Sequence, residues 1–96
     1  MDKERIKKEL VDCSNDILKK YSEYDLIDNV SVMNMAAKTV FLGSLKVYNE
    51  EAVENIINDL ESQLKNYGDI SIRDEKVIPC CAANFTHISF NISISK

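Results

Sequence analysis

Charged side chains are missing from the C-terminal part of this sequence, and glycine and proline are scarce throughout. Residues 77–95 contain no Asp, Glu, Lys or Arg, and the 96 residues include two glycines and one proline. With two glycines, Gly43 and Gly68, the chain has no loop of the kind that cradles phosphate groups in P-loop or dinucleotide-binding proteins. We therefore expect no nucleotide cofactor.

The cysteines are few and odd in number. Cys13 stands alone and Cys80 and Cys81 are adjacent, which is a poor disulfide framework and favours reduced thiols in a cytoplasmic protein. Cys80, Cys81 and His87 are soft metal ligands close together in sequence. Tetrahedral zinc needs four ligands, however, and adjacent cysteines are badly placed to share one ion. We expect no metal site, and the sequence leaves open whether these three side chains have a chemical role.

Membranes and nucleic acids are both disfavoured as partners. No apolar run approaches the about 18 residues that a membrane-spanning helix needs. The N-terminal stretch is charged and no hydrophobic segment follows it, which predicts no signal peptide. The net charge is −4, and the basic residues do not gather into the stripe that binding to a phosphate backbone requires. These features predict one acidic domain spanning residues 1–96.

Two segments have the periodicity of amphipathic helices. The first covers residues 2–24, with Asp2 as its N-cap, and the second follows Asn49, which is also a suitable cap. Gly68 is predicted to adopt the left-handed conformation that ends many helices. The apolar stripes are Ile6, Leu10, Cys13, Ile17, Tyr21 and Tyr24 in the first segment, and Val53, Ile56, Ile57, Leu60, Leu64 and Tyr67 in the second.

Alternation with a period of two predicts strands after Gly68. One strand begins at Ile70 and extends toward Ile78, where Pro79 ends it because proline cannot donate to a ladder. The last strand has one apolar side and one polar side. The apolar side is Ile88, Phe90, Ile92 and Ile94, and the polar side is Ser89, Asn91, Ser93 and Ser95.

The stretch between the helices has two interpretations. Residues 29–35 and 39–48 are rich in Val, Phe and Leu and predict a hairpin with a turn at residues 36–38. The alternative is a helix across residues 31–42, because Met, Ala and Lys have good helical propensity there. The alternation of Val30 and Val32 favours the strands.

The complete order is then α-β-β-α-β-β. Two amphipathic helices packed on one face of a four-stranded, mainly antiparallel sheet form a two-layer α+β sandwich. A ferredoxin-like β-α-β-β-α-β unit acquires this order when its first strand moves to the end of the chain. That is a likeness of topology and carries no function.

No catalytic constellation is visible, so we expect no enzymatic activity. Asp69, Asp74 and Glu75 flank the third predicted strand, where acidic side chains are usually solvated.

The uncharged last strand is the unusual feature, since an exposed edge of this composition invites aggregation. Either the strand is central and its polar side partly solvated, or that side is an interface. The candidate interface residues are Ser89, Asn91, Ser93 and Ser95.

The leading functional hypothesis is a non-enzymatic interaction module that binds a protein partner, or a second copy of itself, through the face or edge of its sheet. A small acidic regulator or inhibitor, such as those carried by mobile elements or phages, fits this size and charge. Two alternatives stay open. One is a subunit of a homo-oligomeric structural assembly, and the other is a sensor domain that holds a small molecule between its sheet and helices.

Overall fold

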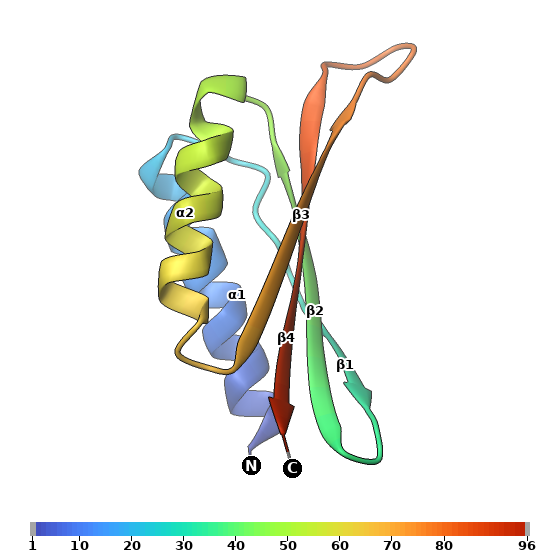
Figure 1. The fold of residues 1–96 in the computed structure, drawn as a ribbon. Coiled ribbons are helices and arrows are strands. Elements are labelled where there is room, and N and C mark those ends of the chain that lie inside the picture. The colour runs from blue at the N-terminus through green and yellow to red at the C-terminus, as the bar shows by residue number, and fades with distance from the viewer. Residues whose placement is uncertain (1, 96) are drawn as a thin grey trace.

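The computed structural model describes residues 2–95, which form two α-helices and a four-stranded sheet (Figure 1). The predicted α-β-β-α-β-β order and the α+β class are confirmed. A short 3-10 turn, η1, leads into the second helix. The elements are α1 (Lys3–Lys20), β1 (Ser31–Asn34), β2 (Lys38–Val47), η1 (Glu50–Ala52), α2 (Val53–Leu64), β3 (Asp69–Val77) and β4 (Phe85–Ser95).

The sheet has the strand order β1-β2-β4-β3, and every neighbouring pair is antiparallel. The C-terminal strand β4 is therefore central and pairs with the whole length of both β2 and β3. This is the order of a ferredoxin-like sheet whose first strand has moved to the end of the chain. Both helices lie on one face of the sheet (Figure 1), and no helix or strand of residues 2–95 covers the other face.

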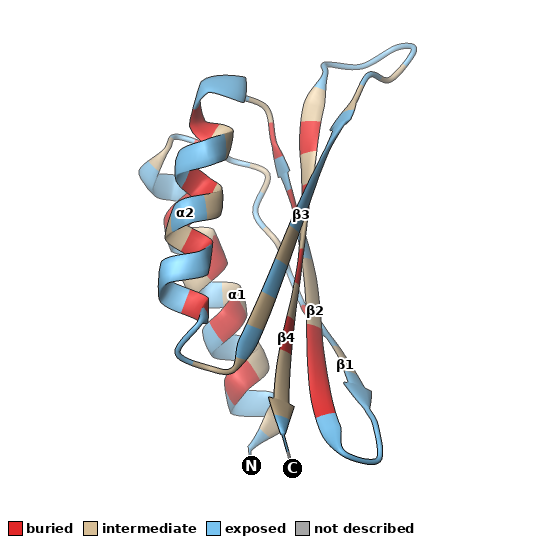
Figure 2. Cartoon of the chain, in the orientation of Figure 1, coloured by how far each residue is buried: buried red, intermediate tan, exposed pale blue. Residues whose placement is uncertain are grey.

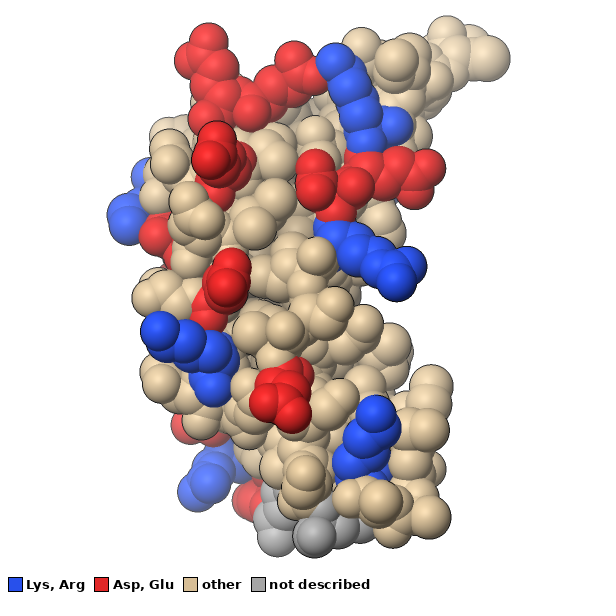
Figure 3. Space-filling view, in the orientation of Figure 1, with Lys and Arg blue, Asp and Glu red and all other residues tan. Residues whose placement is uncertain are grey.

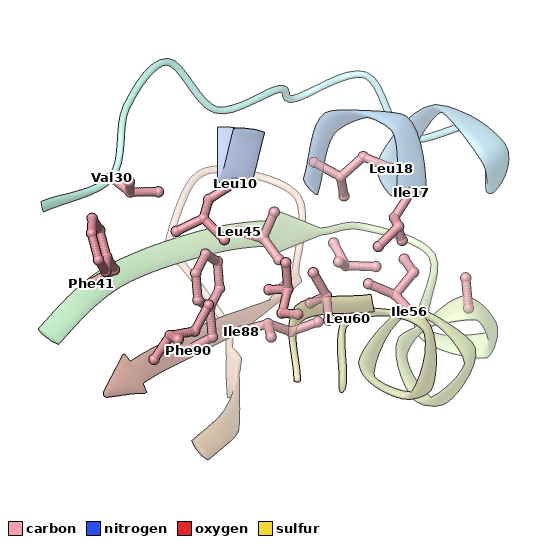
Figure 4. Packing of buried hydrophobic residues seen from close by; sticks show 14 of the residues in the cluster. Leu10, Ile17, Leu18, Val30, Phe41, Leu45, Ile56, Leu60, Ile88 and Phe90 are labelled. Carbon is pink, nitrogen blue, oxygen red and sulfur yellow. The ribbon is translucent and has the colours of Figure 1, made fainter. Parts of the chain in front are cut away.

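The core lies between the helices and the sheet, and both layers contain buried residues (Figure 2). Phe41 and Leu45 of β2 and Phe90 of β4 point toward the helices (Figure 4). Leu10 and Leu60 meet them from α1 and α2 and are fully buried. Burying each such side chain stabilises the fold by about 1.5–3 kcal/mol.

The first helix begins as predicted and ends earlier than predicted. The Oδ1 atom of Asp2 accepts a hydrogen bond from the backbone N–H of Arg5, at 3.1 Å, and so caps the N-terminus. The predicted helix reached residue 24, but α1 ends at Lys20 because Ser22 adopts a left-handed φ of 63°. The N–H of Glu23 then bonds back to the Leu18 carbonyl at 2.9 Å, which closes the helix end as in a Schellman motif.

The prediction for Gly68 was wrong. Its φ is not positive, and α2 has already ended at Leu64. Glycine is needed there for space, since a Cβ on Gly68 would lie 2.4 Å from the carbonyl oxygen of Ser93 in β4. The chain reaches the sheet at Gly68 by a close backbone approach that only glycine permits.

The hairpin interpretation of residues 31–42 is confirmed, and the helical alternative is wrong. Val32 of β1 pairs with Phe41 of β2, and both turn toward the helices. The N–H of Met35 donates to the Lys38 carbonyl at 2.8 Å and closes the turn. Packing of β-branched and aromatic side chains on the sheet therefore outweighs the local helical propensity of Met and Ala.

We expect Leu60→Ala to lower the free energy of unfolding by about 2–5 kcal/mol, because the fully buried side chain leaves a cavity between α2 and the sheet. The matched control is Glu54→Ala on the exposed side of α2, which should change it by less than about 0.5 kcal/mol. Urea denaturation followed by circular dichroism measures both. Equal losses in the two variants would contradict the packing of α2 described above.

Gly68→Ala should lower the free energy of unfolding by about 1–3 kcal/mol, because the new methyl group meets backbone that cannot move aside. Ser71→Ala, at an exposed position of β3, the strand that follows Gly68, is the control and should stay within about 0.5 kcal/mol. If thermal and urea unfolding give Gly68→Ala the same stability as this control, the close approach to Ser93 does not constrain the residue at position 68.

Candidate interaction surface

The face of the sheet away from the helices is built by alternate residues of the four strands. Because side chains alternate along a strand, burial of Phe41 and Leu45 under the helices turns Leu42 and Ser44 to the other side. Directly paired residues share a face, so the register extends this pattern to the other strands. We call this surface the open face. Its residues are Ser31, Met33, Lys38, Val40, Leu42, Ser44, Lys46, Asp69, Ser71, Arg73, Glu75, Val77, Phe85, His87, Ser89, Asn91, Ser93 and Ser95.

Three rows of paired residues cross the middle of the open face. Each row has one residue from β2, one from β4 and one from β3. The first row is uncharged, and the second contains one charged residue. The third row has opposite charges at its two ends. The rows are Leu42, Asn91 and Ser71; Ser44, Ser89 and Arg73; and Lys46, His87 and Glu75.

A shallow trough of about 540 Å³ lies over the first two rows. It extends from Asn29, beside β1, to Arg73 on β3, and so spans the width of the sheet. Short side chains keep it open, and Gly43 presents only backbone to it. On the helix side, the ring of Phe90 occupies the space that a side chain at Gly43 would need. The Cζ atom of that ring would lie 2.3 Å from a Cβ added to Gly43. The trough is lined by Asn29, Ser31, Leu42, Gly43, Ser44, Arg73, Ser89, Phe90 and Asn91.

The amide of Asn91 is incompletely bonded. Its Oδ1 atom is buried and has no hydrogen-bond partner within residues 2–95. A buried acceptor without a donor destabilises a fold by about 1–3 kcal/mol. Asn91 also lines the trough, so this acceptor belongs to a residue that a partner entering the trough would meet.

The charges of the open face are not neutralised by one another. Among the described residues, the ion pairs are Lys20–Asp59 and Lys76–Glu50, and neither includes Lys46, Arg73 or Glu75. Figure 3 shows acidic side chains over α2 and both signs of charge along β3. The open face therefore holds exposed charges of both signs around a neutral centre.

The two edges of the sheet are poorly suited to pairing with another strand. β1 has four residues, and β3 carries Asp69, Arg73, Asp74, Glu75 and Lys76. Short edge strands and charged side chains both discourage edge-to-edge association. The face is consequently the more accessible surface for a partner.

The segment that follows α1 contacts the end of β2 that β1 does not cover. Glu23 is buried, and its carboxylate accepts hydrogen bonds from the backbone N–H groups of Tyr48, at 2.7 Å, and Asn49, at 3.3 Å. The Tyr48 hydroxyl donates to Asp25 at 3.1 Å, which raises the pKa of Tyr48. The Tyr24 ring stacks on that of Tyr48 with centroids 6.1 Å apart. These contacts hold residues 23–25 beside the end of β2.

The four residues predicted as an interface lie together on the open face. Ser89, Asn91 and Ser93 are half-buried at its centre, and Ser95 is exposed at its end. The sequence did not indicate that Ser44 and Arg73 flank Ser89. Alternation within each strand was visible, but the strand order that makes these residues neighbours was not.

The soft metal ligands considered from the sequence are separated. Cys80 and Cys81 are exposed in the connection between β3 and β4, whereas His87 lies on the open face. Cys13, on α1, donates from its Sγ to Oε1 of Gln63 at 2.9 Å, and burial, followed by the charge of Asp16, raises the pKa of its thiol. Within residues 2–95, no three His, Cys, Asp or Glu residues are grouped to hold a metal ion.

His87 and Ser89 are two residues apart on β4 and share the open face. The Ser89 Oγ atom is 3.4 Å from Nδ1 of His87, longer than the about 2.6–3.2 Å of a nucleophile bonded to its base. Glu75 pairs with His87 in the register, yet no hydrogen bond joins their side chains within residues 2–95. The geometry gives no support for a nucleophile at Ser89.

No family model, curated protein or solved structure matches this chain. Among residues 2–95, neither helix is long and apolar enough to cross a membrane. The interpretation of the open face therefore rests on its own geometry.

The double variant Cys80→Ser/Cys81→Ser should change the free energy of unfolding by less than about 0.5 kcal/mol, because both side chains are exposed. Urea denaturation measures this. Elemental analysis of the purified parent should detect no stoichiometric metal. About one equivalent of zinc, lost in the double variant, would show that these thiols do bind metal.

Proposed function

We propose that this protein is a small, acidic, non-enzymatic interaction module of the cytoplasm that binds a protein partner through the open face of its sheet. A regulator or inhibitor of that partner is the role that fits best. The observation that carries the proposal is the difference between the two faces of one sheet. One face is buried under two helices, whereas within residues 2–95 the other has no covering layer.

The centre of the open face has the character of a protein-binding surface. Between Phe85 and Ser95 the central strand β4 contributes no Asp, Glu, Lys or Arg. Depletion of charged residues at the core and a polar rim are typical of protein interfaces. Here the charges stand at the margins, with Lys46 on β2 and Arg73 and Glu75 on β3. The half-buried Asn91 and Ser93 lose little solvation when a partner covers them.

The face is favoured over the edge, and over a site inside the domain. The edge strands are short or charged, as described above. The space between helices and sheet, where a small molecule would bind in a sensor domain, is filled by packed side chains such as Leu10, Phe90 and Leu60. A partner that lies flat on the open face requires no rearrangement of this core.

Charge placed at the centre of the open face should separate folding from binding. Asn91→Lys and Ser93→Glu should leave the circular dichroism spectrum unchanged and weaken partner binding at least about tenfold, because each buries an unpaired charge. Affinity capture from the source cells, with parent and variant proteins as bait, measures the binding.

The matched controls are Asn58→Lys and Ser62→Glu, which make the same changes on the exposed side of α2. They should retain every captured protein. If the open-face variants also retain them all, the open face is not the binding surface. If Asn91→Lys and Ser93→Glu both unfold the chain, this side of β4 is buried within the domain, and the two-layer description fails.

A further inference from the structure

We propose that the open face binds a second copy of this chain, with a two-fold axis running along β4. This inference rests on the proposed function, since it uses the same surface, and it names the partner. The two sheets would stack face to face as in a β-sandwich, about 10 Å apart and within about 30° of alignment. Each β2 then lies opposite β3 of the partner subunit, and each row of paired residues lies opposite the same row.

The row of Lys46, His87 and Glu75 is self-complementary under this symmetry. Lys46 and Glu75 stand on either side of β4, so two strand spacings, about 10 Å, separate them within one chain. Neither has an ion-pair partner among residues 2–95. The two-fold axis places Lys46 opposite Glu75 of the partner subunit and repeats the pair on the other side. Two charge-assisted contacts therefore form from side chains left single in the monomer.

The row of Ser44, Ser89 and Arg73 supplies the second complementary contact. Arg73 meets Ser44 of the partner subunit and enters the partner's trough. A guanidinium has five N–H donors and no acceptor. The trough offers the hydroxyl of Ser44 and the side-chain amides of Asn29 and Asn91. The Oδ1 atom of Asn91 has no hydrogen-bond partner within residues 2–95, so its amide has an acceptor to spare.

The net charge of −4 on each chain is not concentrated on the open face. The basic residues of the open face are Lys38, Lys46 and Arg73, and its acidic residues are Asp69 and Glu75. The excess negative charge of the chain thus lies off the open face, farther from the contact than these side chains.

A dimer built on the open face has to use nearly all of it. Strands about 4.8 Å apart that rise about 3.3 Å per residue give these four strands a face of roughly 500 Å² in projection, before side-chain relief is added. A standard interface buries about 800 Å² of accessible surface on each partner. A dimer therefore has to include the charged margins as well as the neutral centre.

A two-fold axis across the strands through the row that contains Arg73 is disfavoured. Drawn through the row of Ser44, Ser89 and Arg73, it would place Arg73 on Arg73 of the partner subunit, and like charges in contact weaken association strongly. The axis along β4 avoids this repulsion and forms the Lys46 and Glu75 pairs.

The test exchanges charges between two variants. In sedimentation equilibrium at low salt, the parent should dimerise, and Lys46→Glu and Glu75→Lys should each weaken the dimer at least about tenfold, because each creates two like-charge contacts. An equimolar mixture of the two variants should dimerise within about threefold of the parent, since both contacts become opposite-charge pairs in the heterodimer.

The controls make the same charge changes on the helix side. Lys65→Glu and Glu54→Lys, both at exposed positions, should dimerise as the parent does. Lys46 also lies over the Phe85 ring, with Nζ 5.2 Å from its centroid, so circular dichroism should accompany each variant. If Lys46→Glu is unfolded, Lys46→Gln replaces it. That variant should weaken the dimer less than Glu75→Lys and, mixed with Glu75→Lys, should associate more tightly than Glu75→Lys alone.

A parent that stays monomeric at several hundred micromolar overturns this inference, and so does a mixture that associates no better than its components. Neither result affects the proposed function, which is judged by the captured partners. If Asn91→Lys and Ser93→Glu lose a captured protein while the parent is monomeric, the open face binds a different chain. If they lose none, the proposed function fails as well.

Discussion

Pairing of β4 with β2 on one side and β3 on the other is the contact on which the remaining structure depends. The strand that arrives last along the chain occupies the centre of the sheet, so neither half of the sheet is joined to the other until β4 is in place. Its inward side chains, Ile88, Phe90 and Ile92, lie under both helices and are almost fully buried. Both layers therefore depend on the register of one strand, because a slip by one residue would turn this apolar side outward.

The same pairing explains why positions 43 and 68 are glycine, and it sets the shape of the open face. Gly43 lies opposite Phe90 in the register, and its missing side chain leaves room for the aromatic ring on the helix side. Gly68 allows the chain entering β3 to approach the carbonyl of Ser93. Close packing on the inner face and the short side chains on the outer face thus come from one strand whose residues alternate between large apolar and small polar types.

The charged residues discourage other strands from pairing with the edge of the sheet and leave the open face accessible. The long edge strand β3 carries five charged residues, which discourages pairing with foreign strands. The central strand needs no such protection, since both of its edges are occupied. An uncharged strand of this kind would favour aggregation at an edge of the sheet, but at the centre it does not. There it leaves a neutral surface with charged margins. A surface of this kind can bind a partner by its face while resisting aggregation through its edges.

Local periodicity in the sequence was sufficient to predict the two helices, the last two strands and the common face of Ser89, Asn91 and Ser93, and it favoured a hairpin over a helix across residues 31–42. These features depend on repeats of 3.6 and 2 residues, which neighbouring positions in the chain fix by themselves. The tertiary structure alone decided that β4 is central, that Arg73 and Ser44 flank Ser89, and that Gly68 provides space instead of a left-handed turn. Strand order and backbone approach join residues far apart in the chain, and no local pattern records which distant strand will pair with which.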